Sequence, residues 1–228
     1  PGRLRAVGPP GGAGRWSLVA PLLTPEPTAT VAAHATAVQM AERYGVVTRE
    51  AVLAEGISGG YSGVYGVLKV LEERGQLRRG YFVAGLGAAQ FALAGAVDRL
   101  RAAAGHDETI VLAATDPAQP YGAALAWPES AGRPARSANG LVVLRGGKAL
   151  AWYDRRSHHL VTFPETMSDP AWIPALARLI TDGRARTVEV RKVDGGRIPP
   201  ALGEMLEANG FVSSYRGYAA APRVMAGR

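Results

Sequence analysis

The sequence predicts an α+β protein, in which a winged-helix domain is followed by a mostly antiparallel, β-barrel-like module with flanking helices. Three observations predict this fold class. Helical periodicity stops at Gly45, Gly56 and Gly75 in turn, which indicates three successive helices. Two β-like runs, 77–83 and 88–92, come next and are joined by a short glycine-containing turn. Farther along the chain, Gly146-Gly147 separates two apolar runs, which is a strong hairpin signal.

Three segments are expected: an irregular lead-in over 1–29, the winged-helix domain over 30–104 and the β-rich module over 105–228. Residues 1–30 carry six prolines and five glycines, a composition that packs poorly, with a short strand expected at Trp16–Val19. In the first domain we expect helices over 30–44, 49–55, 62–74 and 96–103, with N-caps at Thr30 and Thr48. One apolar stripe, Val31, Ala35, Val38, Ala41 and Tyr44, defines the first helix, and another, Val64, Val67, Leu68 and Leu71, the third.

The second half alternates strands with two helices. Strands are expected over 109–115, 141–145, 148–154, 158–163, 187–192 and 211–218. Asp169 and Pro170 predict a helix start, with the helix running to about Thr181, and a last helix spans 200–208. The polar, Gly- and Pro-containing residues 128–139 are expected to form a mobile loop.

The composition excludes several classes of protein. The 228 residues are 47% hydrophobic and contain no cysteine, which excludes disulfides, thiolate metal sites and cysteine nucleophiles. No run of about 18 uncharged apolar residues is present, so we expect no membrane span and no membrane partner. The basic first residues lack an apolar core and do not resemble a signal peptide, which favours a cytoplasmic location. The chain starts at Pro1 rather than Met, which suggests a fragment of a longer protein.

The charge favours an anionic partner, with nucleic acid first. The formal net charge is +7 and the pI about 10.0. Residues 1–114 carry 11 basic against 9 acidic side chains, and residues 115–228 carry 15 against 10. Only three of the 26 basic residues are lysine. Arginine suits planar contact with phosphate, but a high-GC genome also explains the excess.

The candidate nucleic-acid contacts lie on the third predicted helix and the wing that follows it. Arginine and tyrosine there suit phosphate contact and stacking. A winged helix used only for protein packing is the alternative, and Glu72 and Glu73 weaken the basic face. The arginines of the basic and aromatic cluster over 152–159 are the second candidate contact. The candidates are Tyr65, Lys69, Arg74, Arg78, Arg79, Arg155 and Arg156.

Signals for catalysis or a bound cofactor are weak. No phosphate-binding loop is present, so we expect no ATPase site and no cofactor in this chain. Residues 85–90 nearly match a dinucleotide fingerprint, but Gln90 replaces its third glycine. His158 and His159 point to opposite faces of a strand and do not suit one metal, so no metal site is expected. Asp116 and Asp154 are the weak catalytic candidates, and an aspartate before proline more often shapes a turn.

Three segments carry a resemblance to a known family. They are residues 44–50 (YGVVTRE), 79–92 (RGYFVAGLGAAQFA) and 112–122 (LAATDPAQPYG). Together they resemble the C-terminal region of bacterial large helicase-related (Lhr) proteins, over about Arg15 to Gly217.

The resemblance implies a parent that is an ATP-dependent 3′-to-5′ DNA helicase with a repair role. ATP and Mg would then belong to upstream motor domains. It also implies winged helices followed by a β-barrel module, homo-oligomerisation as a tetramer, and single-stranded or tailed DNA as partner. The region is similar to AlkZ-like DNA glycosylases, and uracil-DNA glycosylase activity is attributed to some members. This chain has no AlkZ-type Gln-x-Gln pair.

Overall fold

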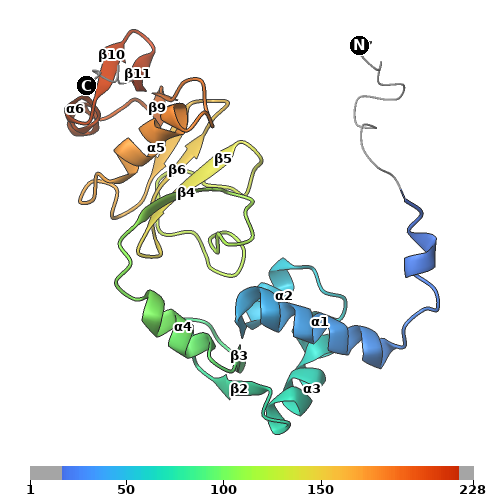
Figure 1. Cartoon of the computed structure of the whole chain (residues 1–228). Coiled ribbons are helices and arrows are strands. Elements are labelled where there is room, and N and C mark those ends of the chain that lie inside the picture. The colour runs from blue at the N-terminus through green and yellow to red at the C-terminus, as the bar shows by residue number, and fades with distance from the viewer. Residues whose placement is uncertain (1–16, 221–228) are drawn as a thin grey trace, which may run out of the picture.

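A computed structural model describes residues 17–220, which fold into two parts joined by helix α4 (Figure 1). The first part holds the helices drawn in blue and cyan, and the second holds the strands and helices drawn from yellow to red. Among the helices between residues 17 and 220, none has the length and apolar character needed to cross a bilayer.

The first part has the element order of a winged helix. The 3-10 helix η1 (Ala20–Leu22) precedes α1 (Ala29–Tyr44), β1 (Val46–Val47), α2 (Arg49–Ala54) and α3 (Gly60–Glu73). The strands β2 (Leu77–Gly80) and β3 (Gln90–Leu93) then form the wing, and α4 (Ala96–Ala103) follows. β3 lies between β1 and β2, and both pairs are antiparallel.

One apolar cluster holds the three helices to this small sheet. The apolar stripe of α3 is confirmed, because Val64, Leu68 and Leu71 are buried. Phe91 of β3 is fully buried in the same cluster, so the wing is anchored to the helices through its own strand. The core of the winged helix therefore positions the strands from which the wing extends.

Three details of the first part differ from the sequence prediction. Thr28, and not Thr30, caps α1, because its Oγ1 accepts a hydrogen bond from the Val31 amide at 3.3 Å. Val31 is 58% exposed and Ala35 is also exposed, so the predicted stripe is wrong at its start. Ala41 is buried as predicted, and Ala37 and Met40 are buried beside it. Of the predicted strand at 16–19, Trp16 lies outside the described residues, and Ser17 to Val19 form no strand.

The second part contains two sheets and two helices. Five strands follow the order β4-β5-β6-β7-β9, antiparallel except for the parallel pair β7–β9. A second sheet has the order β10-β11-β8. The bounds are β4 (Thr109–Ala113), β5 (Gly140–Arg145), β6 (Lys148–Asp154), β7 (His159–Thr162), α5 (Trp172–Thr181), β8 (Glu189–Val190), β9 (Lys192–Val193), α6 (Pro200–Ala208), β10 (Phe211–Ser214) and β11 (Gly217–Ala220).

Both faces of the five-stranded sheet are covered, which explains why β5 and β6 are almost continuously buried. On one face the sheet packs with α5 and α6 around Trp172 and Tyr153. On the other face Trp152 and Phe163 pack with residues of the loop that follows β4. β4 and β9 are the two edges of this sheet, and no closed barrel is formed by residues 17–220, so the barrel-like arrangement is unconfirmed.

The segment 128–139 forms no helix or strand, as expected of a loop, and it packs against the sheet. The Trp152 indole donates a hydrogen bond to the Ala135 carbonyl at 3.0 Å. Arg136 donates to the carbonyls of Gln119 and Asp116, at 2.7 and 3.2 Å. These bonds satisfy carbonyl groups of an irregular segment, which is what allows such a segment to cover a sheet.

Two boundaries in the second part were also predicted wrongly. α5 begins at Trp172, two residues after Pro170, and Asp169 accepts a hydrogen bond from the Ala171 amide at 3.1 Å before the helix starts. The predicted single strand 211–218 is a hairpin, with Ser214 opposite Gly217. The two intervening residues, Tyr215 and Arg216, form its exposed turn.

Candidate nucleic-acid interface

A buried amide holds the wing in shape. The Gln90 side chain is fully buried, and its Oε1 accepts hydrogen bonds from the Phe82 and Val83 amides, each at 2.8 Å. Its Nε2 donates to the Val83 carbonyl at 3.0 Å and the Leu86 carbonyl at 3.4 Å. The residue that disagrees with a dinucleotide fingerprint is therefore the residue that organises the wing. A strand, β3, follows this segment where that fingerprint needs a helix.

Tyrosines on α3 support the wing from the other side. The Tyr61 hydroxyl donates a hydrogen bond to the Ala89 carbonyl, and burial raises the pKa of Tyr61 to about 12. Tyr65 packs edge-on against Phe91, with ring centroids 5.9 Å apart. Tyr65 was predicted to contact nucleic acid, but its ring is half-buried against the core. Its structural role is to join α3 to β3.

Two of the predicted cations on this face have acidic partners. Lys69 Nζ lies 3.8 Å from Glu73, and Arg79 Nε lies 3.2 Å from Glu72. The side chains of all four residues are partly or largely exposed, so these pairs are weak and can exchange for other anions. Arg74 and Arg78 are exposed, and neither has a carboxylate within 4.0 Å in the part of the chain that the structure describes.

Arg78 and Arg79 point to opposite faces of the small sheet, because neighbouring side chains alternate along a strand. Arg79 is opposite Phe91, on the face that carries the helical core. Arg78 is opposite Ala92, on the face of β3 that packs with Ala96 of α4. The two arginines therefore present charge on two sides of the wing.

Asp116 shapes a turn. Its Oδ1 accepts a hydrogen bond from the Ala118 amide at 2.8 Å. The neighbouring Gln119 side chain is buried and donates to the carbonyls of Ala114 and Tyr121, at 3.2 and 2.8 Å. These contacts give Asp116 a structural role at the end of β4.

Asp154 also shapes a turn, the one that carries Arg155 and Arg156. Its Oδ1 accepts hydrogen bonds from the amides of Arg156 and Ser157, at 2.9 and 2.7 Å, and from the Ser157 hydroxyl at 3.0 Å. Burial raises the pKa of Asp154, but the hydrogen bonds from Ser157 and Arg156 outweigh it, so the pKa lies below its ordinary value. Asp154 is thus an acceptor that holds the backbone of the turn from which the two arginines extend.

Sequence reasoning missed two residues that lie beside this turn. Arg184 and Arg186, from the segment between α5 and β8, line the same hollow as Arg155 and Arg156. The basic excess of the second half was the available signal, but nothing local links residues about 30 positions apart.

His158 and His159 each contact a different residue and do not contact each other. His158 Nδ1 lies 3.2 Å from the Tyr153 hydroxyl, and burial together with the nearby Arg191 lowers the pKa of His158. His159 Nε2 accepts a hydrogen bond from the Gly195 amide at 2.8 Å. Within residues 17–220 no group of three or more His, Asp or Glu side chains is placed to hold a metal ion.

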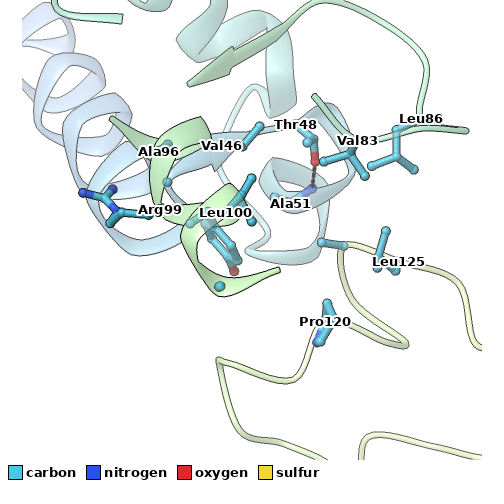
Figure 2. A pocket seen from close by; sticks show the side chains of 14 residues that line it. Val46, Thr48, Ala51, Val83, Leu86, Ala96, Arg99, Leu100, Pro120 and Leu125 are labelled. Atoms are coloured by element: carbon cyan, nitrogen blue, oxygen red, sulfur yellow. Dashed lines mark hydrogen bonds between the residues drawn. The ribbon is translucent and has the colours of Figure 1, made fainter. Parts of the chain in front are cut away.

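An apolar pocket lies between the winged helix and the loop after β4. Figure 2 shows this pocket, of about 450 Å³, with Leu100 and Ala96 of α4 facing Leu125 and Pro120 of the loop. Its lining is mostly apolar, and Arg99 is the charged side chain at its rim. Such a lining suits packing or an apolar group rather than a phosphate.

Comparison with known proteins shows which family the chain resembles. Residues 26–111 match the model of the winged-helix domain of large helicase-related protein. A Mycolicibacterium smegmatis protein named Lhr helicase/probable uracil glycosylase is 42% identical over 192 residues. That alignment covers 80% of this chain.

This chain belongs to the large helicase-related family. The Escherichia coli protein named Lhr helicase/uracil glycosylase is 39% identical over 163 residues, or 67% of the chain. The chain spans 12% and 10% of the length of these two relatives and corresponds to the C-terminal region of Lhr. The matched winged-helix residues run from just before α1 into β4.

Replacing Gln90 by leucine tests the role of its amide. The change leaves the Phe82 and Val83 amides without their acceptor, so we expect the free energy of unfolding to fall by about 1–3 kcal/mol in denaturant titration. Gln39→Leu, on the exposed side of α1, is the matched control, with an expected change within about 0.5 kcal/mol. Equal losses in the two variants would contradict the role of Gln90.

Proposed function

We propose that this chain is a non-catalytic DNA-binding and homo-oligomerisation module of an ATP-dependent DNA repair helicase. The winged-helix domain and the relatives named as helicases support the proposal. In this proposal the motor domains that use ATP and Mg belong to the rest of the parent protein, which acts in the cytoplasm. Single-stranded or tailed DNA is the proposed partner.

The observation that carries the DNA-binding proposal is the arrangement of cations around the wing. Arg74 and Arg78 are exposed and have no acidic partner among residues 17–220. Lys69 and Arg79 are paired with Glu73 and Glu72, but both ion pairs lie at the surface. A DNA strand offers a row of phosphates that such cations neutralise, with release of counterions. Because these contacts reach the backbone and not base edges, we expect little sequence preference.

Exposed apolar side chains support the oligomerisation proposal. Leu18 and Leu22, around η1, are each 83% exposed, and Leu23 beside them is also exposed. Val212 lies exposed on β10, an edge strand of its sheet. Unpartnered apolar residues and open strand edges both favour contact with another chain.

The assembly is tested by the mass of the chain in solution. We expect a multiple of 23.8 kDa, four copies if the family resemblance holds in full. Leu18→Ser combined with Leu22→Ser should lower the mass if the exposed segment contributes to assembly. A 23.8 kDa particle at all concentrations, measured by light scattering, would contradict the proposal.

A DNA glycosylase acting on single-stranded DNA is the second candidate, favoured by the names of both relatives. The test is incubation with uracil-containing single-stranded DNA followed by alkaline cleavage. We expect no strand breaks. Cleavage that Asp116→Asn or Asp154→Asn abolishes, in variants with unchanged melting, would instead establish the glycosylase.

The wing contacts are tested by the double variant Arg78→Ala with Arg79→Ala. For a single-stranded oligonucleotide, each lost phosphate contact lowers the slope of log affinity against log salt by about 0.7. We therefore expect a decrease of up to about 1.4, measured by fluorescence anisotropy at several salt concentrations.

The matched control for this variant is Arg101→Ala with Arg216→Ala, which removes the same charge from α4 and from the β10–β11 turn. Its slope should equal that of the unaltered chain. If the wing packs against protein, the wing variant keeps its slope while the mass or thermal stability of the chain changes.

A further inference from the structure

A second basic surface lies on the second part of the chain. A hollow of about 430 Å³ is formed where the turn between β6 and β7 faces the segment between α5 and β8. Both segments belong to the yellow and orange half of Figure 1. The polar side chains that line the hollow are Asn139, Arg155, Arg156, His158, Arg184 and Arg186.

The four arginines of this hollow are not neutralised by acidic side chains. No aspartate or glutamate lines the hollow. Within the described residues 17–220, none of the four has a carboxylate within 4.0 Å, whereas Arg191 is paired with Glu189. Arg155, Arg156 and Arg186 line this hollow, and Arg184 lies between it and the neighbouring one. Like charges on one surface repel one another and raise the local positive potential, which an anion reduces.

Three buried residues form the base of the hollow. They are Tyr153, Leu179 and Val188. The Tyr153 hydroxyl donates a hydrogen bond to the Glu189 carbonyl at 2.8 Å, which ties β6 to β8. The hydrogen bond joins the strands from which the two sides of the hollow extend.

The guanidinium groups keep most of their donors free. Arg155 Nη2 donates to the Ala138 carbonyl at 2.9 Å, and Arg184 Nη2 donates to the Val111 carbonyl at 3.4 Å. A guanidinium has five N–H donors in a planar fork that matches phosphate oxygens. One bond orients each of these two side chains. The Val111 carbonyl lies on β4, so Arg184 also borders a neighbouring hollow, which Glu108 and Asp182 line.

We propose that this arginine hollow binds the phosphodiester backbone of a DNA strand, as a contact separate from the wing. The proposal rests on the proposed DNA-binding function of the chain. Tyr153 is buried, and the His158 ring is partly buried with its Nδ1 3.2 Å from the Tyr153 hydroxyl, so recognition falls mainly on phosphate. The four arginines would make the hollow a stronger phosphate site than the wing, where Lys69 and Arg79 have acidic partners.

The test is the double variant Arg184→Ala with Arg186→Ala in the full chain, titrated with a fluorescent oligothymidylate at several salt concentrations. We expect the slope of log affinity against log salt to fall by about 1.4, because two phosphate contacts are lost. Arg184→Lys with Arg186→Lys keeps the charge, so it should keep the slope. Thermal melting of each variant verifies folding.

The matched control is Arg178→Ala with Arg197→Ala, which removes the same charge from exposed positions outside the hollow and should leave the slope unchanged. An unchanged slope in the hollow variant, with a flatter slope in the wing variant, overturns the hollow but not the proposed function. If the unaltered chain fails to bind the oligonucleotide, both are overturned. A hollow variant that changes only the mass of the assembly shows that the hollow contacts another copy, and overturns its role in DNA binding.

Discussion

The amide of Gln90 is the interaction on which the wing depends. The connection between β2 and β3 is irregular, and its backbone groups need hydrogen-bond partners if it is to hold one conformation. Gln90 provides an acceptor to two amides and donors to two carbonyls while its own side chain is buried. Because a buried polar group is stable only when it is fully hydrogen-bonded, the wing and the strand that carries Gln90 are ordered together.

Buried polar side chains also hold irregular backbone in the second part of the chain. Gln119 is buried and bonds the carbonyls of Ala114 and Tyr121, and Thr166 is buried and bonds the backbone of Phe163 and Leu150. These side chains fix irregular segments against a sheet whose two faces are both covered.

Local signals in the sequence predicted the helices and hairpins well, and long-range contacts account for what they missed. Glycines with positive φ, such as Gly45 and Gly75, end helices where the sequence indicated, and Gly146-Gly147 forms the predicted hairpin turn. The strand β1 was missed because it has two residues and exists only by pairing with β3. The break in the predicted strand 211–218 depends on pairing between β10 and β11, which composition does not encode.

The candidate site was predicted only in part, for the same reason. Lys69, Arg74, Arg78 and Arg79 lie on α3, at its end, or on β2, as expected, but the acidic partners of Lys69 and Arg79 and the core packing of Tyr65 became evident only in three dimensions. Arg155 and Arg156 were identified as a basic cluster. Their neighbours Arg184 and Arg186 come from a segment beyond α5, so no local pattern could join the four.

The central claim is that phosphate neutralisation by arginines governs the interaction of this chain with DNA. The most direct test is the salt dependence of the affinity of the unaltered chain for a single-stranded oligonucleotide. With the four arginines of the hollow and two of the wing in contact, we predict a slope of about −4 for log affinity against log salt. A slope near zero, or affinity that depends on base sequence and not on salt, would contradict the account.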